Sequence, residues 1–240
     1  MTTLAPPATP ALGSAAAPSF ARAQSLAAQV ADFIVDGIAG GTYAFGQRLI
    51  ETELAARLKV SRVPIREALK MLEAQGILVV TPHRGAYIAE FDKVKSDRVR
   101  DARIALERLA IPDALATFQK HPEKLTVMEE LLARMDQAIE RQDWIDAGKA
   151  DLQFHRQICL ASNNEIVITL WEALARHITI IFGRELSYED GNPKLREQHT
   201  RVLRLIRKGD LEGLHQELHR HVMRYRTPVN GSGPAERREP

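Results

Sequence analysis

The stretch 60-VSRVPIREAL-69 decides how the first part of this chain folds. It places Arg62 and Arg66 four residues apart, so both side chains lie on one face of an amphipathic helix. A buried helix would not carry two arginines on one face, because each charge would need a buried partner. A helix that meets only water does not need Ser61 and Pro64 around the first arginine. The helix is therefore expected to contact a partner outside the fold.

The residues around this helix predict a small unit that ends in a β-hairpin. Apolar residues recur every three or four positions from Leu26 to Ile38, and the glycines after them stop that helix. The segment 51-ETELAARLK-59 predicts a second, short helix, and Gly76 ends the third, which begins near Arg62. Two β-like runs follow, over 77–81 and 85–91, joined by a turn that contains a proline and a glycine. This is the layout of a winged helix-turn-helix.

Beyond Phe91 the strand signals disappear and helical periodicity takes over. Asp143 and Asp210 are candidate N-caps, because a short carboxylate can accept from the free amides of a first turn. Short connections between helices predict a compact antiparallel bundle. Its six helices are expected over 93–120, 123–141, 144–162, 164–184, 194–208 and 210–226. The chain is thus expected to be mainly α, with a disordered tail over 1–23, a winged helix-turn-helix over 24–92, an all-α bundle over 93–226 and a second disordered tail over 227–240.

The composition excludes several classes of protein. The chain of 240 residues has one cysteine, Cys159, so an internal disulfide is impossible, and this fits a reducing cytoplasm. No apolar run near eighteen residues is evident, so a membrane span is not expected. The first 21 residues carry no charge and lack the basic start of a secretory signal. The net charge of +2 is too small to indicate a charged partner, so such a partner must be inferred from the local distribution of charge.

The third helix carries the local charge expected of a DNA reader. The recognition helix of a helix-turn-helix directs its first turns into the major groove. The planar guanidinium of Arg62 or Arg66 matches the two acceptors of guanine or bridges phosphates. Ser61 would cap the helix and also reach a phosphate. From Gly46 to Gly85 seven basic and four acidic residues leave a charge of +3. The alternative is an ordinary charged helix that faces water.

The segment over 41–88 closely resembles the N-terminal domain of GntR-family bacterial transcription regulators. The resemblance lies in residues such as Leu49, the run 53-ELA-55, the run 60-VSR-62 and the run 66-REAL-69. It implies that Arg62 and Arg66 contact DNA and that Gly85 approaches the minor groove beside a basic neighbour. The expected DNA-binding residues are Arg48, Ser61, Arg62, Pro64, Arg66, Arg84 and Gly85.

A second constellation of residues lies in the bundle. Asp151 and His155 stand four residues apart on one helix, so both can reach one ion, and His199 and His221 lie on apolar stripes of two later helices. An unpartnered imidazole on a buried face is costly. One carboxylate and three neutral imidazoles suit Zn²⁺, Ni²⁺, Mn²⁺ or Fe²⁺. The alternative is three separate histidines, each bonded to a backbone carbonyl or to water.

The bundle resembles the FCD ligand-binding domain found in the FadR-type branch of the same family. That resemblance implies that Asp151, His155, His199 and His221 bind a metal, with zinc as the first choice, and that Arg103 holds the carboxylate of an effector. Asn163 matches an asparagine of the pattern, and Glu107 and His177 are further candidates for the effector pocket. The alternatives are a surface salt bridge between Arg103 and Glu107 and a structural role for His177.

These observations predict a metal-dependent, DNA-binding transcription regulator that responds to a small organic acid. It is expected to repress a catabolic operon. A single winged helix reads too short a site, so a homodimer on a palindromic operator is expected. The effector would act through the first bundle helix, which begins a few residues after the wing. Two alternatives remain: a metalloenzyme-like bundle, for which the winged helix would have no use, and a regulator whose metal is purely structural. A closed shell around the metal would favour the last.

Overall fold

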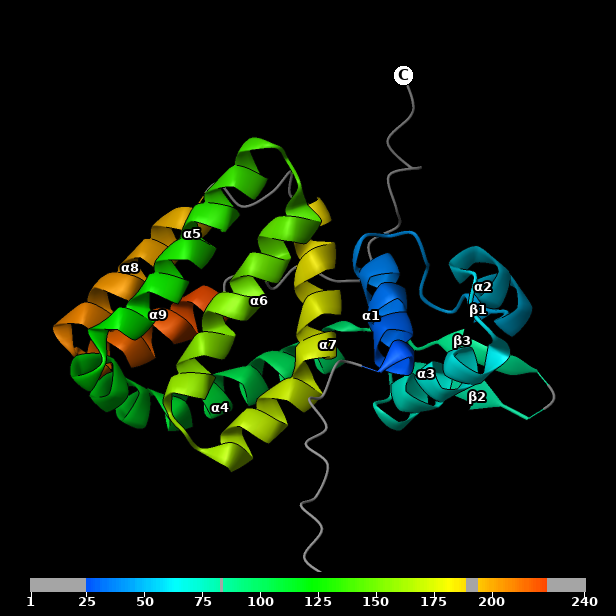
Figure 1. The fold of residues 1–240 in the computed structure, drawn as a ribbon, viewed down its shortest axis with the longest axis horizontal. Coiled ribbons are helices and arrows are strands. Elements are labelled where there is room, and N and C mark those ends of the chain that lie inside the picture. The colour runs from blue at the N-terminus through cyan, green and yellow to red at the C-terminus, as the bar shows by residue number, and fades with distance from the viewer. Residues whose placement is uncertain (1–24, 83, 189–193, 224–240) are drawn as a thin grey trace, which may run out of the picture.

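The computed structural model describes residues 25–82, 84–188 and 194–223, and the two expected tails lie outside these ranges. The first part of the chain is a winged helix-turn-helix, as predicted (Figure 1). Helix α3 packs inward through its apolar face and ends at Ala74. Gly76 follows its C-cap, with a φ of 68° that is the left-handed conformation glycine adopts without strain. The elements are α1 (Leu26–Ala39), β1 (Arg48–Leu49), α2 (Glu51–Leu58), α3 (Arg62–Ala74), β2 (Leu78–Thr81) and β3 (Gly85–Ile88).

The wing is a small antiparallel sheet with the strand order β1-β3-β2. Leu78 pairs with Ile88 and Thr81 with Gly85, so β2 and β3 form the expected hairpin. The predicted second strand is three residues too long, because after Ile88 the chain leaves the sheet towards the bundle. Strand β1 was not predicted, since two residues are too few to show a period.

The second part of the chain is the predicted helical bundle. Asp143 accepts from Asp146 N and Asp210 from Gly213 N, so both expected N-cap bonds form. Ser61, in contrast, makes no side-chain cap bond to α3. The helices are α4 (Lys93–Lys120), the 3₁₀ turn η1 (Pro122–Lys124), α5 (Leu125–Glu140), α6 (Trp144–Ala161), α7 (Glu165–Tyr188), α8 (Leu195–Lys208) and α9 (Leu211–Met223).

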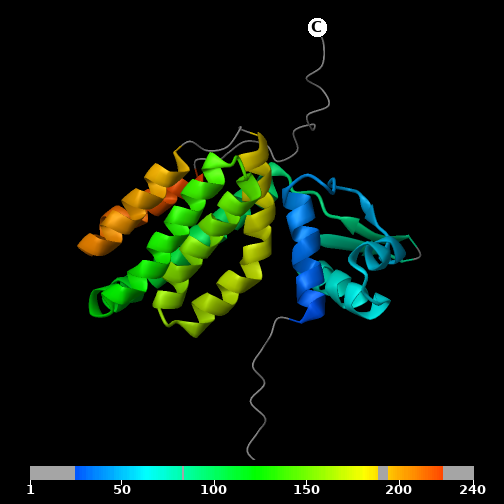
Figure 2. The same cartoon turned by 45° about the horizontal axis from the view of Figure 1, so that its top comes forward.

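The two parts share one continuous hydrophobic core. Buried side chains run without a break from Val30 in α1 to Val222 in α9. Helix α1 lies beside α7 in both views of the molecule (Figures 1 and 2). The winged helix is therefore docked on the bundle through a specific helix–helix contact in addition to the chain connection at α4.

Helix α7 is the most apolar of the described helices by membrane criteria. The segment Glu165–Glu185 has a mean hydropathy of 1.5 and is long enough to cross a membrane by length and composition alone. The sequence-based expectation of no such stretch was therefore too strict. In the structure this helix packs against α1, α4 and α6, and core helices of ordinary globular proteins pass the same test.

Candidate nucleic-acid interface and metal centre

Helix α3 presents the two arginines of the motif to the outside. Arg62 and Arg66 are exposed, and the Nε of Arg66 donates to Glu51 Oε2 at 2.8 Å. Both charges are available to a polyanion, although Arg66 must exchange its acidic partner for a phosphate or a base. Ser61 is also exposed and keeps its hydroxyl free of a cap bond.

Pro64 does not belong to this exposed face. Its side chain is buried, so the expectation that it contacts DNA does not fit the structure. The residue lies in the first turn of α3, where an amide has no helical partner and proline is tolerated. Pro64 therefore supports the start of the helix from within.

The wing places further basic groups at the turn between β2 and β3. Gly85 has a φ of 99°, and a Cβ there would lie 3.1 Å from Arg48 Nε, so the Arg48 guanidinium lies directly against the turn. Arg84 is exposed, and its carbonyl accepts from the Tyr87 hydroxyl at 3.2 Å. The turn thus carries two guanidinium groups beside a glycine that lets a backbone approach closely.

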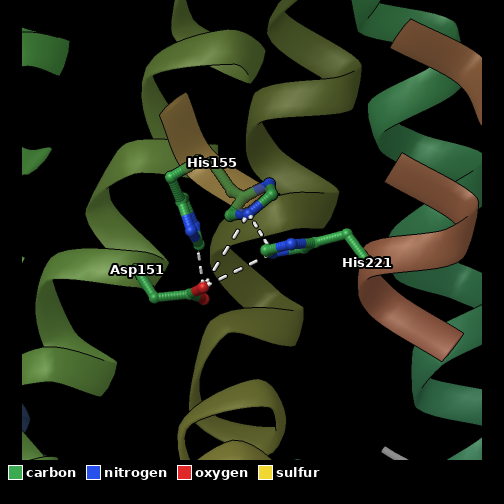
Figure 3. A group of neighbouring side chains, drawn as sticks. Asp151, His155 and His221 are labelled. Carbon is green, nitrogen blue, oxygen red and sulfur yellow. Dashed lines mark hydrogen bonds and ion pairs between the residues drawn. The ribbon is translucent and has the colours of Figure 1, made fainter. Parts of the chain in front are cut away.

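The structure brings Asp151, His155, His199 and His221 together inside the bundle. One ligand atom of each lies within 4.8 Å of the others, and all four side chains are buried. Figure 3 shows Asp151 and His155 of α6 and His221 of α9 pointing toward one another. The Nε2 atom of His199 is 2.9 Å from Asp151 Oδ1, and the Nε2 atoms of His155 and His221 are 3.1 Å apart.

In two of the imidazoles the Nδ1 atom, which faces away from the centre, is hydrogen-bonded to an oxygen, and this arrangement suits a cation at the centre. His155 Nδ1–H donates to Glu107 Oε2 at 2.9 Å, and His199 Nδ1–H donates to the carbonyl of Leu195 at 2.8 Å. With their protons held there, both rings turn the lone pair of Nε2 toward Asp151. Bonds of this kind orient the histidine ligands of metal sites. Acceptor atoms that face one another in a buried place are costly, and a positive charge between them would offset that cost.

The protonation states agree with this arrangement. Burial lowers the pKa of His155, with Arg103 adding to the effect, and burial together with His199 lowers the pKa of His221 to about 3. Both imidazoles are therefore neutral near pH 7, as ligands must be. Burial would raise the pKa of Asp151, but the Arg103 guanidinium beside it brings this pKa well below its usual value. The carboxylate is therefore ionised.

Arg103 and Glu107 form a buried bridge to the centre rather than a surface salt bridge. Arg103 Nε donates to Glu107 Oε1 at 2.8 Å, and both side chains are fully buried. Glu107 also holds His155, so it orients a candidate ligand and is not free to hold an effector. Burial opposes its ionisation, yet His155 and Arg103 lower the pKa of Glu107 to about 2. Sequence reasoning missed this link, because the two residues are 48 positions apart.

Two further candidates for the effector pocket lie elsewhere. Asn163 is exposed at the C-terminal end of α6, where it bonds to Thr117 Oγ1. His177 faces the winged helix: its Nε2 donates to the carbonyl of Gln75 at 2.9 Å. Neither residue is brought to the cluster. Helical periodicity places a residue on a face but does not say which neighbour that face meets.

A residue that the sequence did not single out does lie beside Arg103. The Arg103 guanidinium is 5.7 Å from the centre of the Trp171 ring and 4.8 Å from that of Phe182. The Trp171 ring is fully buried. Yet Trp171 Nε1 and both terminal nitrogens of Arg103 have no hydrogen-bond acceptor among the described residues.

Known proteins resemble the chain over both parts. Residues 26–88 match the model of bacterial regulatory proteins of the gntR family, and residues 98–224 match the FCD domain. A probable D-xylose utilization operon transcriptional repressor of Paenarthrobacter nicotinovorans is 30% identical over 84% of this chain and 87% of its own length. The Nta operon transcriptional regulator of Aminobacter aminovorans is 31% identical over 67% of this chain and 74% of its own length.

A solved structure supports the same relationship. E. coli McbR/YncC superposes with a TM-score of 0.70 at 27% identity, over 84% of this chain and 95% of that one. These proteins are transcription regulators and not enzymes, which removes the metalloenzyme alternative. The chain belongs to the GntR family of bacterial regulatory proteins, as a DNA-binding transcription regulator whose second part is an FCD domain.

Proposed function

We propose that this regulator binds a divalent metal ion in its FCD domain and uses it to recognise a small organic acid. The observation that carries the proposal is the buried cluster of Asp151, His155, His199 and His221, in which two imidazoles are already oriented toward the centre. Zinc is the first choice for this set of ligands, and Ni²⁺, Mn²⁺ and Fe²⁺ suit it as well. The ion would supply positive charge and coordination positions that the four side chains do not fill.

The donors around Arg103 support a carboxylate as the ligand. The terminal nitrogens of Arg103 and Trp171 Nε1 are buried without acceptors, and leaving such donors unpaired is costly. Arg103 Nη2 is also only 3.5 Å from Asp151 Oδ2, so the arginine borders the metal cluster directly. A carboxylate beside the ion could accept from the guanidinium. Asn163 and His177, placed elsewhere by the fold, are not part of this proposed site.

A purely structural metal is the second candidate, and one observation favours it. The cavity that Asp151 lines has a volume of about 10 Å³, so an organic acid does not fit into it without movement of the bundle. An acid that occupies this cavity would have to separate α6 from α7.

One experiment separates the two candidates. Metal content would be measured in the purified protein, followed by thermal unfolding in the presence of small mono- and dicarboxylates, with and without a chelator. We expect about one metal ion per chain and at least one acid that raises the melting temperature only when metal is present. Metal without any acid response would support the structural role, and protein that binds no metal would remove both.

We propose that the two parts of the chain have separate roles. Residues 24–92 would read DNA and residues 93–226 would bind metal and effector. We propose that the protein works in the cytoplasm, where its DNA lies. The relatives from Paenarthrobacter nicotinovorans and Aminobacter aminovorans are named as regulators of operons. A third relative, from Bacillus licheniformis, is named as a gluconate operon transcriptional repressor. By analogy we propose that this chain represses a catabolic operon.

The DNA-reading role gives a direct prediction. Replacing Arg62 or Arg66 by alanine should weaken operator binding by about 5- to 150-fold, which corresponds to about 1–3 kcal/mol for a contact to a base. Both side chains are exposed, so the melting temperature should stay near that of the wild type. Titration of an operator selected from random DNA measures the effect. Lys208→Ala, an exposed charge on α8, is the matched control, and wild-type affinity in both arginine variants would contradict the assignment.

A homodimer is part of the proposal, and the bundle offers a surface for it. Leu109 of α4 and Ile166 and Leu170 of α7 are 64%, 70% and 50% exposed. Helices α4 and α7 pack against each other, so these three exposed side chains lie on neighbouring helices. Large apolar side chains that gather on a surface indicate an interface. We propose that a second copy of the chain covers them.

This surface can be tested by introducing charge. Leu109→Glu combined with Leu170→Glu should convert a dimer into a monomer at micromolar concentration, because two pairs of carboxylates would be buried without partners. Light scattering after size exclusion gives the mass. Val127→Glu, on α5, changes an apolar residue that is 43% exposed and lies on another helix, and it should leave the dimer intact. A dimer that persists in the double variant would place the interface elsewhere.

A further inference from the structure

Helix α7 has two faces with different neighbours. Trp171, Ile178 and Phe182 recur at helical spacing and are buried toward the bundle. The rings of Trp171 and Phe182 lie within 5.7 Å and 4.8 Å of the Arg103 guanidinium. This face of α7 is therefore a wall of the proposed acid site.

The opposite face of α7 holds the winged helix. Arg176 Nε donates to Asp32 Oδ1 at 2.8 Å, and Arg184 Nη2 donates to the carbonyl of Tyr43 at 3.0 Å. Between these contacts Gly183 lies against Ala39, so closely that a Cβ on the glycine would be 2.7 Å from the Cβ of Ala39. Only glycine permits this approach of α7 to α1.

The same face reaches the end of the recognition helix. Gln75 is the C-cap of α3, and its carbonyl accepts from His177 Nε2 at 2.9 Å. Its side-chain oxygen accepts from Arg176 Nη1 at 3.3 Å. The orientation of α3 is thus fixed directly by α7, and not only by the connection through α4.

The small cavity beside the metal cluster connects the two faces. It is lined by Asp151 of the cluster, by Phe182 and Gly183 of α7, and by Ala39 of α1. At about 10 Å³ it holds one water molecule at most. A ligand that extends from the cluster in this direction must part α6 from α7, and it meets the Gly183–Ala39 contact at the far end.

We propose that α7 carries the signal from the acid site to the recognition helix, and that the Gly183–Ala39 contact is where an extended acid displaces the DNA-binding unit. The ligand class that follows is an acid with a tail beyond the carboxylate, since the carboxylate alone would not reach this contact. The proposal rests on the proposed function, and it adds a second route to the expected one through the start of α4. Movement of α1 would carry α3 with it, because the two helices pack together.

Gly183→Ala tests the contact without knowledge of the acid. Alanine is the better helix former, so α7 should persist, while its Cβ pushes Ala39 away. We expect the full-length, zinc-loaded variant to bind a selected operator at least about fivefold more weakly, the lower limit of typical allosteric coupling. Amide hydrogen exchange over residues 71–77 should accelerate. Zinc stoichiometry should equal that of the wild type.

A compensating change and a second variant complete the test. Adding Ala39→Gly to Gly183→Ala removes the clashing Cβ and should restore most of the operator affinity. If Gly183→Ala does not fold, Arg176→Ala takes its place: losing the bonds to Asp32 and Gln75 should accelerate exchange over 71–77. Arg156→Ala is its control, because Arg156 pairs with Glu172 rather than with Asp32 or Gln75 and should not alter that exchange.

The two proposals fail in different ways. If the protein binds no zinc but Gly183→Ala still weakens operator binding, the metal proposal is wrong and the contact is supported. If zinc binds and the folded variants of Gly183 and Arg176 keep wild-type operator affinity and wild-type exchange over 71–77, the proposed route through α7 is wrong.

Discussion

Replacing His199 by alanine is expected to remove the metal ion while the protein still binds its operator. His199 is fully buried, its Nε2 faces Asp151 at 2.9 Å, and its other nitrogen is held by the carbonyl of Leu195. Alanine removes one of the four ligands and leaves a space that no neighbouring ligand can fill. Metal analysis after dialysis should fall from about one ion per chain to background. The acid response should disappear with the metal.

The metal-dependent part of the stability is the decisive measurement for this variant. The cavity left by the imidazole lowers the stability of the metal-free protein as well, so the melting temperature alone is ambiguous. Free metal at 100 times its dissociation constant should stabilise the wild type by about 2.7 kcal/mol and the variant hardly at all. His219→Ala, an exposed histidine on the same helix as His221, should behave as the wild type. If an acid still shifts operator affinity in metal-free protein, the ion does not anchor the ligand.

The fold was predictable because its signals are local. Apolar residues at helical spacing placed every long helix within a few residues, and a carboxylate at the right position marked the starts of α6 and the last helix. The misses were also local in origin. Strand β1 has two residues and no period, and the end of β3 depends on where the chain turns toward α4. Pro64 looked like part of the exposed motif, yet the phase of α3 turns it inward.

The candidate site was less predictable, because its contacts are tertiary. Spacing and resemblance together selected Asp151, His155 and the two later histidines, which the fold brings to one point. They could not show that Glu107 bonds His155 from another helix, or that His177 turns to the winged helix. The docking of α1 on α7 depends on Gly183, whose importance appears only when a second helix lies against it.

Removing the Arg103 side chain is expected to be the most destabilising of these substitutions. Its guanidinium is fully buried, pairs with Glu107 at 2.8 Å, and lies 3.5 Å from Asp151. Arg103→Ala leaves two buried carboxylates without that charge, which typically costs about 3–5 kcal/mol. Unfolding in urea would measure the loss. Arg98→Ala, on the exposed side of α4, should change the stability by no more than about 0.5 kcal/mol.

The role of Arg103 in acid recognition needs a variant that keeps the charge. Arg103→Lys retains a cation near Glu107 and Asp151, so the fold and the metal should both persist, but lysine lacks the planar pair of terminal donors that matches a carboxylate. We expect metal content equal to that of the wild type, together with loss of the thermal shift that the best acid produces. An acid response that survives in Arg103→Lys would mean that the charge alone, and not the fork of the guanidinium, recognises the ligand. An unchanged response in folded Arg103→Ala would exclude this arginine from the acid site, and the unpaired donor of Trp171 would then be the group to examine.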